Sequence, residues 1–268
     1  MKHTFLNRYR HGTSLIHQLD PRLKLLATLA FVLAVTSTPP AGWPAFALLA
    51  VLAAGSIRLA GIPLWEGLRR STIALPFVGM AAFSLPFTRA GQVVWGFQIM
   101  GWQINVTDAG LLLFASVMVK AWLSVLVSGL LVVSSPFTHL VSAMRALRVP
   151  PALTSTISFM YRYLFVLVDE ALRLQTAREA RSAGRGRTVL WRAQVLGWMV
   201  GSLFIRSYER SERIYVAMLS RGFTGEEQSL MGLTWRPRDS WAGLAWAGTL
   251  LVVGLLGRVW ASSASGGL

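Results

Sequence analysis

Long apolar stretches, separated by short polar or Pro/Gly-rich segments, dominate the pattern of this chain. A helix needs about 20 apolar residues to cross the hydrocarbon core of a bilayer. Five stretches meet or approach that length: residues 25–38, 43–57, 71–87, 109–133 and 241–260. The first two flank the Pro/Gly-rich residues 38–42, so we expect them to form a helical hairpin. We therefore predict an all-α integral membrane protein with about five transmembrane helices.

A sixth apolar stretch, residues 153–168, is also a candidate span. If it crossed the membrane, residues 169–238 and their twelve arginines would lie outside, although cytoplasmic loops are the ones enriched in Lys and Arg. A return crossing at residues 195–205 is too short to span the bilayer. We therefore place residues 134–238 in the cytoplasm as long helices. Their apolar faces are then expected to pack against the membrane interface, the spans or a partner protein.

The composition supports this reading. Hydrophobic residues make up 54% and charged residues 14% of the 268 positions, whereas soluble domains carry about 25% charged residues. The 26 Lys and Arg outnumber the 11 Asp and Glu, and 15 of these 26 lie between Arg145 and Arg238. In a soluble protein the net charge of +15 would indicate nucleic-acid binding. In a membrane protein an excess of positive charge marks the cytoplasmic side. We therefore expect the chain to contact membrane lipid and not nucleic acid.

The charge distribution also orients the chain. The N-terminal residues 1–24 are basic, whereas residues 38–42 are uncharged and residues 91–107 hold no Lys or Arg. The N-terminus is therefore expected in the cytoplasm and the C-terminus outside the cell inner (plasma) membrane. The basic start does not fit a removed signal peptide. We divide the chain into a four-span region (1–133), the cytoplasmic helices (134–238) and a last span with its tail (239–268).

Catalytic and cofactor-binding motifs are absent from the sequence. There is no phosphate-binding P-loop, because the Gly-rich residues 184–187 are too few and lack its Lys and hydroxyl. There is no Cys, and the four His show no metal-ligand spacing. Asp108 is expected to cap a helix, and Lys120, in the middle of a span, needs a polar partner or a functional role. We predict no catalytic, cofactor-binding or metal site in this chain.

Two arginines stand out in the cytoplasmic segment. Each lies near an expected helix end, between two small residues: Ala180-Arg181-Ser182 and Ser220-Arg221-Gly222. Small neighbours allow a helix end to approach a groove closely, and a guanidinium can bind carboxylates there through two hydrogen bonds. An arginine at a helix C-terminus also simply suits the helix dipole. Two matches on consecutive helices favour a pair of docking points for a dimeric partner.

These residues resemble a known family, the transmembrane T component of energy-coupling factor transporters, and most closely its cobalt-type CbiQ group. The resemblance covers nearly the whole chain. It rests on residues 19–26 (LDPRLKLL), residues 135–150, the first Ala-Arg-Ser motif and residues 212–223, where an Ala-Met pair precedes Arg-Gly-Phe. Ser220 departs from the family, which more often has Ala there, but remains small. The cobalt assignment rests on residues 7–9 and 14–17.

The resemblance implies a coupling subunit that contains no ATPase domain of its own. Its two Arg motifs would dock on two ABC ATPase subunits of the CbiO/EcfA type, which bind the ATP, while this chain binds no cofactor. Residues 134–238 would be the family's cytoplasmic coupling helices. Their apolar side would hold a substrate-binding membrane subunit of the CbiM type, with or without a CbiN-like subunit. Cobalt uptake is the first choice of transport activity, and nickel or vitamin uptake is the alternative.

Two other classes of function compete with this one. An integral-membrane enzyme acting on anionic lipid would use the cytoplasmic arginines to bind head-group phosphates, but no acid/base pair or metal motif accompanies them. A stand-alone channel or carrier is disfavoured because Lys120 is the one ionisable residue in the middle of a span. Identification of the proteins that co-purify with the chain would separate these classes.

Overall fold

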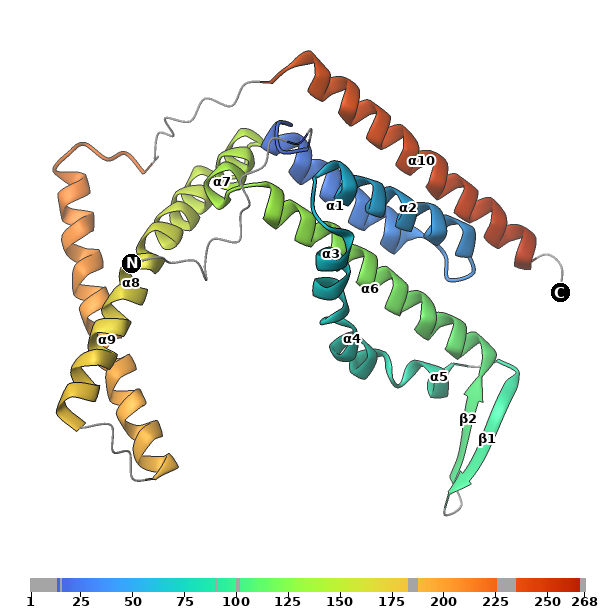
Figure 1. The fold of residues 1–268 in the computed structure, drawn as a ribbon, viewed down its shortest axis with the longest axis horizontal. Coiled ribbons are helices and arrows are strands. Elements are labelled where there is room, and N and C mark those ends of the chain that lie inside the picture. The colour runs from blue at the N-terminus through green and yellow to red at the C-terminus, as the bar shows by residue number, and fades with distance from the viewer. Residues whose placement is uncertain are drawn as a thin grey trace. The chain divides into compact units, whose positions relative to one another are not determined.

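The computed structural model describes residues 14, 16–89, 91–99, 102–182, 188–225 and 235–265. In this part of the chain the regular structure is α-helical except for one antiparallel hairpin. The elements, shown in Figure 1, are α1 (Pro21–Ser37), α2 (Trp43–Leu59), α3 (Leu64–Thr72), α4 (Leu75–Ala82), α5 (Leu85–Thr88), β1 (Val93–Ile99), β2 (Trp102–Thr107), α6 (Asp108–Ser134), α7 (Phe137–Ala146), α8 (Pro151–Ser182), α9 (Val189–Leu219) and α10 (Pro237–Ser265). The predicted all-α membrane fold is confirmed, with the hairpin as an addition.

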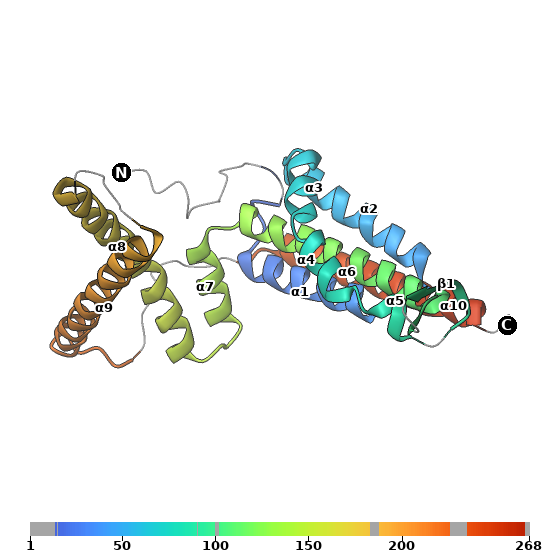
Figure 2. The same cartoon turned by 90° about the horizontal axis from the view of Figure 1, so that it is seen from below.

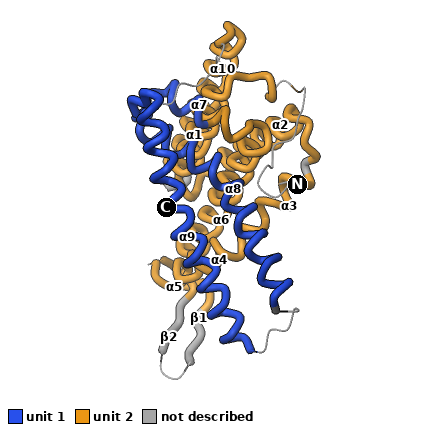
Figure 3. Tube along the Cα trace, turned by 90° about the vertical axis from the view of Figure 1, so that its left-hand side faces the viewer, with its two compact units in different colours: residues 1–4, 141–232 blue, residues 5–140, 233–268 orange. Residues whose placement is uncertain are grey.

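The chain divides into two compact units, coloured separately in Figure 3. The larger unit consists of residues 5–140 and 233–268, and the smaller of residues 1–4 and 141–232. The smaller unit, which contains α8 and α9, is thus almost entirely an insertion into the larger one. The chain leaves the larger unit within α7 and returns to it shortly before α10.

The core of the larger unit lies among α1, α2, α6 and α10, which run side by side (Figure 2). Phe31, Leu49 and Leu123, from three of these helices, are fully buried. Trp246 of α10 stacks on Phe31 with 6.1 Å between ring centroids, and its indole N–H donates to the Ala27 carbonyl at 3.1 Å. Four of the five predicted spans therefore form one packed bundle.

The predicted third span, residues 71–87, is not one helix. The structure breaks this region into α3, α4 and α5, and proline lies in the first turn of both α4 and α5. Proline is tolerated in a first turn but removes a hydrogen bond and clashes in a helix interior, so Pro76 and Pro86 each start a new helix. The combined stretch Trp65–Thr88 is still long and apolar enough to cross a membrane.

Length and composition identify four helical stretches in the described residues that can cross a membrane: Trp65–Thr88, Asp108–Ser134, Pro151–Arg181 and Pro237–Trp260. Trp43–Leu59 is a shorter apolar helix. The stretch Pro151–Arg181 is the one that the arginine distribution places in the cytoplasm. Its side of the membrane stays a prediction.

The hairpin was not predicted from the sequence. β1 and β2 pair in antiparallel fashion, with Trp95 opposite Val106. Thr107, the last residue of β2, caps α6 by accepting a hydrogen bond from the Gly110 N–H at 3.3 Å. The expected capping role of Asp108 is therefore wrong by one position, since Asp108 is the first residue of the helix.

The smaller unit is built on two long helices, α8 and α9, which cross each other (Figure 2). The separate apolar and arginine-rich segments expected between residues 153 and 187 form one continuous helix up to Ser182. A salt bridge of 3.0 Å between Glu170 of α8 and Arg206 of α9 joins the two helices. No residue of α9 is buried, so most of its surface is open to a partner or to lipid.

Candidate functional site

Arg181 lies in the last turn of α8, where both it and Ala180 are exposed. Ser182 ends the helix, and its side chain is outside the described part. One turn earlier, the Arg178 guanidinium lies 5.7 Å from the centre of the Trp191 ring at the start of α9, within cation–π range. The turn that carries Arg181 is therefore braced by the following helix, and Arg181 is left to face outward.

Glycine was expected to end this first helix. The candidates Gly184 and Gly186 lie outside the described residues, as does Arg185, which was expected on the same face as Arg181. The helix itself ends at Ser182.

Arg221 lies in a well-defined helix end. The Phe223 N–H donates to the Met218 carbonyl at 3.1 Å, and the Gly222 N–H donates to the Leu219 carbonyl at 3.0 Å. This pair of bonds is the Schellman motif, in which the residue after the cap adopts a left-handed conformation. Gly222 has φ of 76°, which confirms its predicted role as a left-handed terminator. Arg221 therefore lies between the cap residue Ser220 and the left-handed Gly222, and it is exposed together with Ser220.

The Arg221 end is held against α8 by an aromatic contact. Phe223, the second residue after Arg221, packs edge-on to Phe159 of α8 with 6.2 Å between ring centroids. Phe159 and Arg181 are 22 positions apart on α8, which at 1.5 Å per residue corresponds to about 33 Å. The structure therefore keeps the two Arg motifs in one unit but well apart, so they do not form a single site.

A groove between α8 and α9 adjoins this anchored end. It encloses about 320 Å³ and is lined by Phe159, Tyr163, Val166, Leu167, Ser207, Arg210, Ser211, Ile214 and Met218. Large apolar side chains elsewhere on α9 are strongly exposed, among them Trp198 at 74% and Phe204 at 70%. Such an apolar surface marks a site for protein or membrane contact.

Lys120 of α6 has a polar partner in the larger unit. Its ammonium donates to the Thr36 carbonyl in the last turn of α1 at 3.0 Å and lies 6.0 Å from the Phe46 ring. The last four carbonyls of a helix have no partner within the helix, so Lys120 caps α1 from a neighbouring helix. The structure thus supplies the partner that a lysine in the middle of a span requires.

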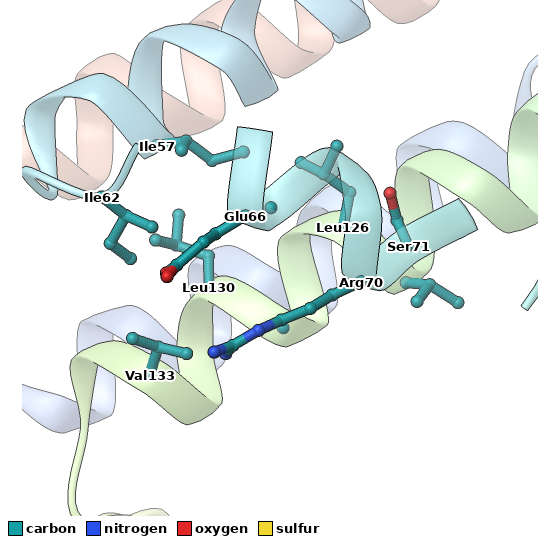
Figure 4. Close-up of a pocket in the computed structure, with 11 residues that line it drawn as sticks. Ile57, Ile62, Glu66, Arg70, Ser71, Leu126, Leu130 and Val133 are labelled. Carbon is teal, nitrogen blue, oxygen red and sulfur yellow. The ribbon is translucent and has the colours of Figure 1, made fainter. Parts of the chain in front are cut away.

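The cavity enclosed by α2, α3 and α6 is small (Figure 4). Its volume is about 30 Å³, which is the share of one water molecule in the liquid. Glu66 and Arg70, four residues apart on α3, lie beside apolar side chains such as Leu130 (Figure 4). This space is too small for a vitamin. Among the described residues no group of three or more His, Asp or Glu is placed to hold a metal ion.

The comparison with known proteins decides the family. A family model described as a cobalt transport protein, CbiQ, matches residues 12–231. The chain belongs to the CbiQ family. The match includes both Arg motifs and the LDPRLKLL segment, whereas residues 7–9, used for the cobalt assignment, lie outside both the match and the described residues.

Relatives of this CbiQ-family chain include two energy-coupling factor transporter transmembrane proteins named EcfT. The one from Lactobacillus helveticus is 27% identical over 96% of this chain and 94% of its own length. The one from Lactococcus lactis subsp. cremoris is 26% identical over 90% of this chain and 92% of its own length. A Methanocorpusculum labreanum protein, whose name describes a fused cobalt transport protein CbiMQ, is 33% identical over 78% of this chain and 35% of its own length.

These matches confirm the resemblance derived from the motifs. The CbiQ-family chain is a multi-pass membrane protein and the transmembrane component of an energy-coupling factor transporter. In that transporter it is a non-catalytic subunit that associates with other components.

Proposed function

We propose that this chain couples two ABC ATPase subunits of the CbiO/EcfA type to a separate substrate-binding membrane subunit. The observation that carries the proposal is the placement of Arg181 and Arg221. Each is exposed at the end of a long helix beside a small residue, and about 33 Å of α8 separates the two ends. Two spaced arginines suit two equivalent acidic grooves on a dimeric partner.

The docking site in this proposal consists of Ala180, Arg181, Ser182, Ser220, Arg221 and Gly222. ATP binds to the partner subunits, and this chain contributes no cofactor site. The exposed apolar surface of α9, with Trp198 and Phe204, is where the substrate-binding subunit packs. The N-terminus lies in the cytoplasm and the C-terminus outside the inner membrane.

Cobalt is the proposed cargo, bound by a CbiM-type partner with or without a CbiN-like subunit. The support is the description of the matching family and the name of the fused CbiMQ relative. Nickel or a vitamin is the alternative, because the names of the two EcfT relatives specify no cargo. Uptake of Co²⁺, Ni²⁺ and labelled vitamins by the complete complex in vesicles would separate these cargoes.

The docking proposal predicts that reversing the charges of Arg181 and Arg221 detaches the ATPase subunits. In Arg181→Glu/Arg221→Glu, each glutamate would face an acidic groove, so we expect the ATPase subunits to be lost and transport to fall to background. Co-purification of ATPase subunits with tagged chain measures the first effect, and vesicle uptake measures the second.

The matched control is Arg213→Glu, the same charge reversal on α9 at an exposed position paired only weakly with Glu209 at 3.9 Å. It should retain the ATPase subunits. A double variant that purifies with a full complement of ATPase subunits and pumps normally would contradict the docking proposal.

A further inference from the structure

A buried ionic cluster lies in the larger unit where three helices meet. Lys24 of α1 is 8% exposed, and the carboxylates of Asp20 and Asp239 near it are 5% and 1% exposed. The Lys24 ammonium donates to the His17 carbonyl at 3.1 Å and to the Ser134 carbonyl at 3.2 Å. The second bond crosses from α1 to the last residue of α6, whose carbonyl has no N–H donor within its own helix.

Each carboxylate of this cluster also accepts a hydrogen bond from a backbone N–H at the N-terminus of a helix. Asp20 accepts a hydrogen bond from the Arg22 N–H at 2.8 Å at the beginning of α1. Asp239 accepts one from the Arg236 N–H at 3.0 Å at the beginning of α10. The remaining oxygens, Asp20 Oδ2 and Asp239 Oδ1, are buried without a hydrogen-bond partner among the described residues. The carboxylates therefore face Lys24 mainly through their charge.

Burying the charges of this cluster is energetically unfavourable. Lys24 lies just before the first predicted span, and burial lowers its pKa to about 8, while the charges of Asp20 and Asp239 oppose that decrease. Burying ions frequently costs more than their attraction returns, so buried ionic groups are weak evidence for stability. A structural role alone would be served as well by apolar packing. This favours a role that depends on fixing three helix ends together.

The position of the cluster in the chain indicates that role. Ser134 is where the chain leaves α6 on its way to the inserted smaller unit, and Asp239 is in the first turn of α10, just after the chain returns. His139 of α7, on the outgoing connection, is also close enough for the Lys24 charge to lower its pKa. Arg238, the second residue of α10, donates to the Gln18 carbonyl at 2.9 Å. The outgoing connection and the helix into which the return connection leads thus both meet the chain at the N-terminal end of α1.

We propose that Lys24, Asp20 and Asp239 form a clamp that transmits movement of the inserted unit to α1, α6 and α10. This inference rests on the proposed coupling function. In the described part of the chain, a displacement of the insertion reaches the bundle through residues 135–140, which follow α6, and through residues 235 and 236, which lead into α10. With the clamp closed, both connections move with the three helix ends. Without it, each connection can shift while the bundle stays in place. Lys24 is accordingly a positioning residue for coupling, not a contact for ATPase or cargo.

Lys120 offers a matched control inside the same helix pair. Like Lys24, it donates to a carbonyl in the last turn of a neighbouring helix, in this case Thr36 of α1. Its hydrogen bond lies away from Lys24, because Thr36 is at the opposite end of α1. Replacement of either lysine by methionine removes the same kind of bond and the same charge. A difference in transport per ATP between the two variants would therefore come from the position of Lys24 in the fold.

The test uses the complete complex, with its ATPase and substrate-binding subunits, in vesicles. Transport per ATP hydrolysed is measured with Co²⁺, or with Ni²⁺ if the wild-type complex takes that ion. Lys24→Met should keep its ATPase subunits and hydrolyse ATP, but transport per ATP should fall about fivefold or more, the lower range for coupling between linked sites. Lys120→Met should keep the wild-type ratio. Lys24→Arg, which retains charge and donors, should restore much of the loss.

Asp239→Asn provides an independent variant if Lys24→Met does not assemble. The amide oxygen of asparagine keeps the bond from the Arg236 N–H, but the charge that faces Lys24 is gone, so transport per ATP should again fall. An assembled Lys24→Met or Asp239→Asn complex with the wild-type ratio would overturn the clamp, as would an equal loss in Lys120→Met. A wild-type chain that binds no ATPase subunit would instead contradict the proposed function itself.

Discussion

Gly61, Arg148 and Gly222 share one backbone conformation, with φ of 70°, 64° and 76°. Each follows a helix end and directly precedes a residue whose N–H returns to the last turn of that helix, as in the bond from Val149 to the Met144 carbonyl at 3.2 Å. A left-handed residue with a side chain is disfavoured by about 1 kcal/mol relative to glycine. Two of these three helix ends therefore have glycine, which suits the left-handed conformation, whereas the end of α7 has Arg148.

Gly222 separates the effect of size from that of backbone strain. Nothing lies within 4 Å of a Cβ added at Gly222 or at Gly225, and asparagine tolerates the left-handed conformation of both. We expect Gly222→Asn to preserve the end of α9 but to weaken docking, because its side chain occupies the approach beside Arg221. Retention of ATPase subunits in a pull-down measures this.

Gly225→Asn is the matched control, three positions further along the chain, and should retain the ATPase subunits. Equal retention by both variants would mean that the small size of residue 222 is irrelevant to the partner.

His139 predicts a pH dependence. Burial, and secondarily the positive charge of Lys24, lowers the pKa of His139 below its usual 6.5. The folded chain therefore binds fewer protons at this site than the unfolded chain between that lowered pKa and 6.5. The stabilisation is complete above pH 6.5 and is lost as the pH falls through the folded pKa.

The prediction is tested by thermal unfolding of the purified protein at pH 7.5 and 5.5. His139→Gln should show a smaller decrease in Tm at the lower pH than the natural chain. Identical decreases in both proteins would assign the acid sensitivity to other groups.

At the scale of elements, the sequence predicted most helices because their apolar runs are long and continuous. Asp108–Ser134 and Pro237–Ser265 extend the predicted spans by only a few residues at each end. The sequence prediction treated the third span as one continuous helix, because its hydropathy stays high throughout. Pro76 and Pro86 were the signals that the helix is broken. The hairpin had a signal too, in the Val- and Trp-rich residues 93–95 and the Trp at 102.

The helix end at Arg221 was predictable for a related reason. Arg221 precedes a glycine at a helix end, a local pattern with a known backbone geometry. The Lys24 cluster was not predictable, because its members come from three segments up to 219 positions apart and only the packing of α1, α6 and α10 brings them together.

The end of α7 yields an element-level prediction. Arg148 is exposed and occupies the left-handed position after this helix, so Arg148→Gly should relieve strain and stabilise the protein by up to about 1 kcal/mol. Thermal unfolding followed by tryptophan fluorescence measures the change. Arg148→Ala, which keeps the Cβ, should give no such gain, and stabilisation by both variants would attribute the effect to the lost charge.

At the scale of the whole molecule, the sides of the membrane follow from charge alone and need a direct test. The chain has no Cys, so single cysteines can be labelled without background. Gln92→Cys, before the hairpin, and Ser263→Cys, near the C-terminus, should react in intact cells with a reagent that does not cross membranes. Glu179→Cys, in α8, should react only after permeabilisation.

The same experiment decides the path of α8, which is long and apolar enough to cross. Labelling of Glu179→Cys from outside would place the last turns of α8 and the Arg181 motif beyond the reach of a cytoplasmic ATPase, and would contradict both the topology and the docking proposal.

The two prolines that divide α3, α4 and α5 have a consequence for the fit of the protein to its bilayer. A continuous helix has a fixed rise of 1.5 Å per residue, so α6 matches a membrane of one thickness and otherwise must tilt. A span in three pieces has two joints at which it can shorten or extend. We expect the protein to accommodate thicker and thinner bilayers chiefly through this jointed segment, while the bundle of α1, α2, α6 and α10 keeps its length.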